Sequence, residues 1–346
     1  MTKPKTRVRR WTLPAFALVL ALVFSLLSPV SALAASQEPQ MTMVVLGDSI
    51  ASGYGVPAGL GYAPIVARSQ NMALVNCAVG GWRTEHVVNQ LRTDEATREA
   101  VKAADVIQIT IGGNDLQQAG HVGPAIDAIM QGDKSVWEQH SENIAARFSQ
   151  IVALVRDLNP TAPFFVFNSY SPDYKRFGAI NISSTIGATV DVTGNELYAI
   201  AQDYAIPRFN QTYERYLQKN PGAFILVDVF SAFPGNASSY YGLGIDVIHP
   251  SASGHAKLAD RLNTAIDVYN NKHVQTEPTA KVEKLCGNKN LLTIEIKETY
   301  PLKPATTITV SLIVNNNAAG HYKIGKHTVY VDTKGNNKCK ACHMMK

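Results

Sequence analysis

Five short apolar runs recur from Met41 onward, and most of them end at a glycine, an asparagine or an aspartate. They lack strict alternation with polar residues, which indicates strands buried on both faces, as in a parallel sheet. The runs are Met43–Leu46, Leu74–Val75, Val106–Ile111, Phe164–Phe167 and Phe224–Val227.

Between these runs, apolar residues recur at intervals of three and four, which predicts amphipathic helices. The clearest cases are residues 144–158, which stop before Pro160, and residues 258–269. Alternating strands and helices predict a right-handed, doubly wound α/β sandwich. In such folds the ligand site lies beyond the carboxyl ends of the strands.

The pattern changes near residue 273. Residues 273–280, with Pro278 among polar residues, are predicted as a linker that ends an α/β domain of residues 35–272. Beyond it, β-branched residues cluster in Leu291–Lys297, Thr306–Val314 and His327–Val331, with glycines and asparagines between them. This indicates a small, β-rich appendage over residues 281–346.

Residues 1–34 have the layout of a secretory signal peptide. Five basic residues precede a charge-free run that extends from Trp11 to Gln37 and contains Ser31-Ala32-Leu33-Ala34. We expect cleavage after Ala34 and a secreted, extracellular protein. The alternative is an uncleaved membrane anchor, because the apolar run is nearly long enough to span a bilayer.

Composition and charge exclude some classes of protein. With 46% hydrophobic and 17% charged residues, the chain of 346 residues is unlike a disordered, collagen-like or coiled-coil protein. The net charge of +5 is unevenly distributed: residues 35–280 hold 16 basic and 23 acidic residues, whereas residues 281–346 hold 11 lysines and 4 acidic residues. We therefore expect no nucleic-acid partner. The basic appendage could dock on an anionic cell-surface polymer, or its lysines could protect solvated strand edges, which is the interpretation we favour.

Four segments that follow predicted strands contain residues that could take part in a reaction. Ser49, in Gly47-Asp48-Ser49-Ile50, is placed as a nucleophile whose N–H can face an oxyanion. Gly81 follows the second strand, and Asn114, which follows the third, supplies a neutral side-chain donor. Each segment alone has an ordinary interpretation as a helix cap or a turn.

The fourth segment, Asp246-Val247-Ile248-His249-Pro250, comes shortly before the last helix. His249 could remove a proton from Ser49, and Asp246 could orient the imidazole. Together the four segments provide a nucleophile, a base, an orienting acid and three oxyanion donors, which is the inventory of acyl transfer.

On these residues the chain resembles the SGNH hydrolases, also called GDSL esterases/lipases. The resemblance covers roughly residues 41–270. It implies a flavodoxin-like three-layer α/β/α sandwich with five parallel strands, and a serine esterase that needs no metal or other cofactor.

The resemblance also implies site residues. Ser49, Asp246 and His249 would form the catalytic triad, and the oxyanion hole would comprise Ser49, Gly81 and Asn114. Because the second segment reads Gly80-Gly81-Trp82-Arg83-Thr84, Gly80 is the alternative donor, although the spacing from Asn76 favours Gly81.

The expected function is therefore hydrolysis of carboxylic esters by a secreted esterase or lipase through an acyl-enzyme. One alternative is a carbohydrate esterase that deacetylates polysaccharide. Another, from a different class, is a surface-binding protein with a vestigial hydrolase domain, against which the intact triad residues argue.

Several other residues have weaker claims on the site. His255 is interpreted as a packing or capping residue, Asp48 as the organiser of its turn, and Asp228 as a poorer triad acid because no histidine lies near it in sequence. The loop of residues 171–194 is predicted to set specificity. Five rings could line an acyl or sugar pocket or pack on the core: Tyr170, Tyr174, Phe177, Tyr240 and Tyr241.

The four cysteines have several possible bonding states. Cys286 could pair with Cys339 or Cys342 in an oxidising compartment, and the same three residues with His343 have ligand types that suit zinc. Cys339-Lys340-Ala341-Cys342-His343 also matches a haem-attachment pattern, but it lies in a β-like tail without a helical scaffold.

Overall fold

The computed structural model describes residues 40–118, 120–233, 238–285, 289–315, 318–331 and 340–341. The predicted signal peptide and its cleavage site lie outside these residues. Within the described part of the chain, none of the helices combines the length and the apolar character needed to cross a bilayer.

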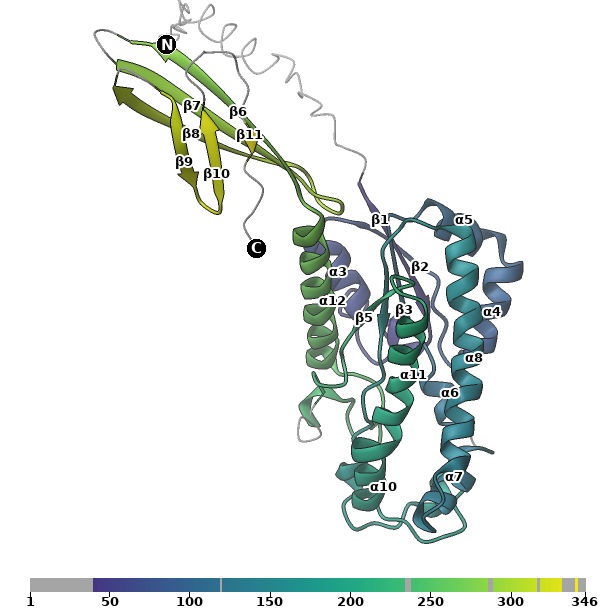
Figure 1. Cartoon of the computed structure of the whole chain (residues 1–346). Helices are drawn as coiled ribbons and strands as arrows, with labels where there is room; N and C mark the ends of the chain where they lie inside the picture. Colours follow the sequence, from purple (N-terminus) through teal and green to yellow (C-terminus); the bar gives the residue numbers. More distant parts are fainter. Residues whose placement is uncertain are drawn as a thin grey trace, which may run out of the picture. The chain divides into compact units, whose positions relative to one another are not determined.

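A five-stranded parallel sheet forms the centre of the α/β domain (Figure 1). Its spatial order is β2-β1-β3-β4-β5, which is the flavodoxin-like order, and β1 and β3 are neighbours at the topological switch point. The predicted five parallel strands are thus confirmed. The strands are β1 (Thr42–Gly47), β2 (Ala73–Asn76), β3 (Val106–Thr110), β4 (Phe164–Phe167) and β5 (Ile225–Val227).

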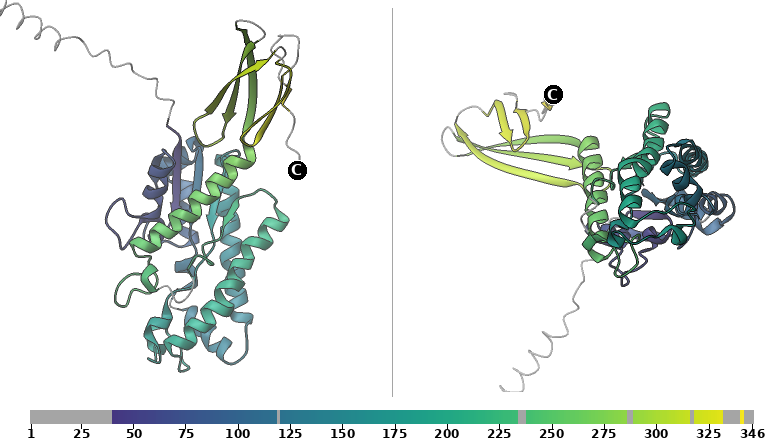
Figure 2. Two further views of the ribbon diagram at one scale, coloured as in Figure 1. Left: turned by 90° about the vertical axis from the view of Figure 1, so that its left-hand side faces the viewer. Right: turned by 90° about the horizontal axis from the view of Figure 1, so that it is seen from below.

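Helices cover both faces of this sheet and make three layers (Figures 1 and 2). Alternate residues of β1 explain why its run is apolar throughout. Val44 and Leu46 pack with α4, α5, α8 and α11, whereas Met43 and Val45 pack with α3 and α12. The longer helices are α3 (Tyr62–Ser69), α4 (Thr84–Thr93), α5 (Glu95–Ala103), α7 (Val122–Met130), α8 (Ser135–Leu158), α10 (Gly194–Ile200), α11 (Ile206–Lys219) and α12 (Ala252–His273).

Short helical turns stand where strands give way to loops. Those that matter for the site are α2 (Ser49–Ser52), α6 (Gly113–Leu116), and the 3₁₀ turns η1 (Tyr174–Phe177) and η3 (Ser238–Tyr240). The remaining ones are α9 (Ser183–Ile186) and the π-helical turn η2 (Ala201–Ala205), which joins α10 to α11.

The C-terminal region is β-rich, as predicted, and contains two antiparallel sheets. Their inner faces share a small apolar core made of Leu292, Ile294 and Ile296 with Ile324 and Val329. The strands are β6 (Gln275–Lys284), β7 (Lys289–Thr299), β8 (Thr306–Asn315), β9 (Gly320–Ile324), β10 (His327–Val331) and β11 (Lys340–Ala341).

The predicted linker at residues 273–280 is wrong. α12 runs to His273, and Gln275 already begins β6, which pairs with β7 from Gln275↔Thr299 to Lys284↔Asn290. Pro278 and the scarcity of bulky apolar residues suggested a linker. However, β6 is an edge strand, and an edge strand tolerates a proline because one side of its backbone has no ladder partner.

Three of the lysines on β6 and β7 are interleaved with glutamates. Pairing and alternation place Lys281, Lys289 and Lys297 on one face of the sheet with Glu277, Glu283 and Glu295. Interleaved charges of this kind are typical of a solvated strand surface. Docking of the appendage on an anionic polymer stays a prediction, and this face adds nothing to it.

A buried carboxylate joins β7 to β10 and to the turn before β10. Glu298, at the end of β7, is 5% exposed and contacts Tyr300, Lys326 and His327, the last two at 2.9 Å. Burial raises the pKa of this carboxyl, but hydrogen bonds from the three neighbours outweigh burial and lower the pKa to about 2.

We predict that Glu298→Gln weakens the appendage in a pH-dependent way. The carboxyl has an ordinary pKa of 4.5, so its contribution is complete above that pH and disappears as the pH falls towards 2. At neutral pH the variant should lose about 1–3 kcal/mol of local stability. Amide hydrogen exchange of β7 and β10 in the full chain measures this loss.

The matched control is Glu283→Gln, because the Glu283 side chain is half-exposed beside Lys281 and its pair should matter little. An equal loss for Glu298→Gln at pH 7 and pH 3 would contradict the assignment.

Candidate active site

Ser49 is the first residue of α2, and only Asp48 separates it from β1. Gly47 permits this placement: its φ is +133°, and a Cβ there would lie 2.1 Å from the carbonyl oxygen of Thr110. The buried carboxylate of Asp48 accepts a hydrogen bond of 3.0 Å from the N–H of Ile50, so Asp48 organises the turn. The N–H of Ser49 has no intrahelical acceptor at this position of a helix, which leaves it available to a ligand.

Asp48 itself is an unusual acid. Burial raises its pKa to about 7; the N–H of Ile50 opposes this shift and the nearby Asp115 carboxylate adds to it. The turn beneath Ser49 therefore carries less negative charge near neutral pH than an ordinary aspartate would give it.

The glycines after β2 form a tight turn beside Ser49. The N–H of Trp82 donates to the carbonyl of Val79 at 3.3 Å, and Gly81, the third residue of this turn, has a φ of +79°. A positive φ at that position defines a type II turn and favours glycine. A Cβ on Gly80 would lie 3.8 Å from the Cβ of Ser49, so Gly80 stands directly against the serine. Both glycines therefore remain candidates for the donor.

Asn114 lies in α6, directly after β3, and its side-chain amide donates to the carbonyl of Trp82 at 2.8 Å. The next residue, the buried Asp115, accepts from the N–H and the hydroxyl of Thr84 at 2.9 and 2.6 Å and from Arg147 at 3.2 Å. These bonds tie the loop after β2 to the loop after β3. Two of the predicted oxyanion donors, Gly81 and Asn114, thus lie on segments that hold each other in place.

Ser49, His249 and Asp246 come together in one line of hydrogen bonds. Nε2 of His249 lies 3.0 Å from Oγ of Ser49, and Nδ1 lies 3.1 and 3.2 Å from the two carboxylate oxygens of Asp246. Asp246 also accepts the backbone N–H groups of Ile248 and His249. Partial burial raises the pKa of Asp246, but these N–H bonds and the imidazole outweigh burial, so the net pKa is lowered.

This line of contacts has the geometry of a nucleophile, a base and an orienting acid. A carboxylate that stays ionised beside Nδ1 keeps the proton on that nitrogen and leaves Nε2 free to accept the proton of the serine. The tilted ring of Tyr54, with its centroid 4.5 Å from that of His249, covers one side of the imidazole. Sequence reasoning missed Tyr54 because nothing in its pattern links it to residue 249.

The other candidate residues have structural roles. His255 is fully buried, its Nδ1 accepts from the N–H of Tyr62 at 3.3 Å, and burial lowers its pKa to about 4. It therefore caps α3 and packs, as predicted. Asp228 contacts Asn168 and Ser231 rather than a histidine.

All five predicted pocket rings pack in or against apolar clusters, and two of them also line a pocket. Tyr241 is buried in the core, and Phe177 packs in a small cluster with Ile182 and Leu197. Tyr170 stacks on Phe233 with ring centroids 4.3 Å apart, so it also supports the core. Tyr170 and Tyr174 line an apolar pocket whose wall includes Gly113, Leu116, Trp137 and Ile200.

The cysteine predictions fall mostly outside the described residues, which include neither Cys286 nor Cys339, Cys342 and His343. Cys77 is a half-buried free thiol, and burial raises its pKa. Across the residues that the structure describes, no group of three histidines, cysteines or acidic residues is placed to hold a metal ion.

Comparison with known proteins relates this chain to a family and to curated relatives. The chain matches the model of the GDSL-like lipase/acylhydrolase family over residues 45–257. It is 25% identical over 236 residues to the uncharacterized protein YpmR of Bacillus subtilis (strain 168), and the alignment covers 66% of this chain and 82% of that protein. It is 26% identical over 233 residues to the spore germination lipase LipC of Bacillus licheniformis, with 64% and 93% covered.

Solved structures are similar as well. The lipase Lip_vut3 from a goat rumen metagenome is 25% identical, with a TM-score of 0.49, and the match covers 65% of this chain and 97% of that one. The class that the fold and the family match define is an α/β hydrolytic enzyme of the esterase/lipase type. Because the family model spans well over half of the sequence, the chain belongs to the GDSL-like lipase/acylhydrolase family.

Proposed function

We propose that this protein is a secreted serine esterase or lipase that hydrolyses carboxylic esters through an acyl-enzyme. The observation that carries the proposal is the line of hydrogen bonds from Asp246 through His249 to Ser49, with 3.1 Å and 3.0 Å between the joined atoms. These residues lie on α2 and on the loop before α12, at the edge of the parallel sheet where α/β enzymes bind their ligands.

In the first half of the reaction, Oγ of Ser49 attacks the ester carbonyl while Nε2 of His249 takes the hydroxyl proton. The carbonyl oxygen becomes an oxyanion. The N–H of Ser49, the N–H of Gly81 and the side-chain amide of Asn114 are the donors that we assign to it. Collapse of the tetrahedral intermediate breaks the bond to the alcohol, which leaves with the proton from His249.

In the second half, His249 removes a proton from water, and the hydroxide attacks the acyl-enzyme. The intermediate collapses, Oγ of Ser49 regains its proton from His249, and the carboxylic acid leaves. Asp246 stays ionised throughout and stabilises the imidazolium in both halves.

This mechanism predicts a graded loss of activity on a short p-nitrophenyl ester. Ser49→Ala and His249→Ala should each lower kcat by about four orders of magnitude or more, because each removes a group that the chemical step requires. Asn114→Ala should lower kcat by about two to three orders of magnitude, because it removes one oxyanion donor. Steady-state kinetics and labelling of Ser49 by a fluorophosphonate measure these effects. Undiminished turnover in both Ser49→Ala and His249→Ala would refute the mechanism.

The surroundings of the site favour esters with an apolar acyl chain over acetylated glycans. Leu243 and Ile245, on the loop that bears Asp246, are 94% and 85% exposed, which leaves apolar surface next to the site. The apolar pocket lined by Tyr170 and Tyr174 includes Gly113, the neighbour of Asn114, in its wall. The similarity to a relative named as a lipase points in the same direction.

An acyl-length series tests this preference. We expect kcat/KM to rise from acetyl to butyryl and octanoyl p-nitrophenyl esters, because each added methylene buries apolar surface. Replacing Leu243 and Ile245 together by serine should reduce the gain without affecting acetyl ester turnover. Faster release of acetate from acetylated xylan than of octanoate from its p-nitrophenyl ester would instead favour the carbohydrate esterase.

Export is proposed from residues 1–34, whose basic start, apolar middle and small-residue end are those of a signal peptide. We expect the protein recovered from the culture medium to begin at Ala35, and N-terminal sequencing checks this. A chain that stays in the membrane fraction with Met1 intact would support the anchor instead.

A further inference from the structure

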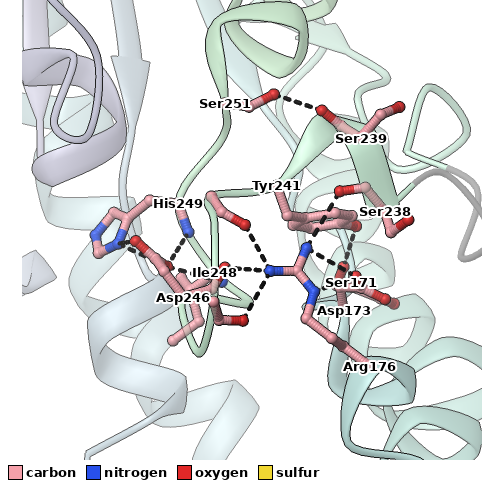
Figure 3. Close-up of polar contacts among 12 residues, drawn as sticks. Ser171, Asp173, Arg176, Ser238, Ser239, Tyr241, Asp246, Ile248, His249 and Ser251 are labelled. Carbon is pink, nitrogen blue, oxygen red and sulfur yellow. Dashed lines mark hydrogen bonds and ion pairs between the residues drawn. The ribbon is translucent and has the colours of Figure 1, made fainter.

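Arg176 lies in η1, in the loop that follows β4, and its guanidinium binds the loop that carries Asp246 and His249 (Figure 3). Nη1 donates to the carbonyl oxygens of Gly242, Gly244 and Asp246 at 2.5, 3.1 and 3.3 Å. Nη2 donates to the carbonyl of Ser238 at 3.1 Å. One side chain thus binds four carbonyls of a segment that lies 62 to 70 positions away in the sequence.

The guanidinium is itself held in position. The carboxylate of Asp173, which is 3% exposed, lies 3.1 Å from Nη2 and 3.2 Å from Nε of Arg176. A planar guanidinium presents five N–H donors in a rigid fork, so it can satisfy this carboxylate and several carbonyls at once. An ammonium on a flexible stem cannot span the same set of acceptors.

The carbonyls that Arg176 binds surround Asp246. Gly242 packs against the acid so closely that a Cβ on this glycine would lie 3.0 Å from both Cβ and Cγ of Asp246. The N–H of Gly242 also donates to the carbonyl of His249 at 2.8 Å. Arg176 therefore holds the backbone on which both the acid and the base stand.

Three further bonds join the same two loops. The hydroxyl of Tyr170 donates to Ile248 at 2.8 Å, the hydroxyl of Tyr241 donates to Ser171 at 2.6 Å, and the N–H of Asp173 donates to Val247 at 2.8 Å. All three acceptors are backbone carbonyls. Arg176 is the charged centre of this interface.

We propose that Arg176 is a positioning residue that sets the orientation of Asp246 towards His249 and so aligns the imidazole with Ser49. This inference rests on the proposed esterase function, since it assigns Arg176 a role through two residues of that mechanism. A displacement of about 1 Å in a catalytic group can cost about 100-fold in rate, so losing Arg176 should be felt in kcat rather than in KM.

The test compares Arg176→Met with wild type in the full chain on p-nitrophenyl butyrate. We expect kcat to fall by about 10- to 100-fold with KM changed less than about threefold. Arg176→Lys keeps a positive charge beside Asp173 but loses the forked set of donors, so its kcat should lie between those of wild type and Arg176→Met. A kcat within twofold of wild type for Arg176→Met would overturn the proposal.

Arg156 on α8 provides the matched control. Its guanidinium also binds three backbone carbonyls, those of Ala223, Ala162 and Asn159 at 2.9, 2.7 and 3.4 Å. Two of these residues come just before β5 and β4, at the sheet edge opposite the site. Arg156→Met should lower the melting temperature and leave kcat unchanged, and an equal fall in kcat would show that lost stability explains both variants.

A double-mutant cycle with Asp246→Asn separates positioning from a general structural effect. If Arg176 acts through Asp246, adding Arg176→Met to Asp246→Asn should lower kcat by less than about threefold. The same 10- to 100-fold loss in both backgrounds would overturn the proposal. Should Arg176→Met not fold, the same cycle with Arg176→Lys decides.

Ser49→Ala, assayed beside these variants, distinguishes the two levels of inference. Full activity in Ser49→Ala would remove the proposed function and the role of Arg176 with it. An inactive Ser49→Ala together with an unaffected Arg176→Met would remove the role of Arg176 alone.

Discussion

The contact of 3.0 Å between Oγ of Ser49 and Nε2 of His249 joins residues 200 positions apart, and the other features of the site depend on it. It can form because the strands of a parallel sheet all end at the same edge, so loops from distant parts of the chain meet there. Gly47 completes the arrangement, since only a glycine lets β1 end this close to the carbonyl of Thr110. The apolar core therefore serves the site by fixing where the strands end.

Loops at this edge hold one another through buried polar contacts. Asp115 ties the segment after β2 to the segment after β3 through Thr84, and Arg176 ties the loop after β4 to the loop of Asp246. In both cases a charged group binds backbone or hydroxyl partners that would otherwise be poorly solvated. Such groups are expensive to leave unpaired, so each loop is stable mainly in the presence of the other. This mutual dependence fixes the loop that carries Asp246 and His249, whereas Ser49 and Asn114 stand on the short helices α2 and α6.

The sequence predicted most of the fold because its strands carry a clear signal. Runs such as Phe164–Phe167 are apolar at every position, as only strands covered on both faces need to be. The error at residues 275–280 has the opposite cause: β6 is an edge strand with a proline and a largely polar face. β6 forms a strand because it pairs with β7, and the local sequence of a strand gives little information about its partner.

By itself the sequence singled out candidates for the chemistry, because Ser49 and Asn114 follow strands and His249 precedes the last helix, each in a recognisable local context. Only the tertiary structure decided how they are held. It placed Gly80 directly against the serine, where the spacing had favoured Gly81, and it set Tyr54 against the imidazole. It also brought Arg176 to four carbonyls of a distant loop. Every residue has a backbone carbonyl, so the sequence does not show which of them a side chain will bind. Contacts of this kind are decided only when the chain folds.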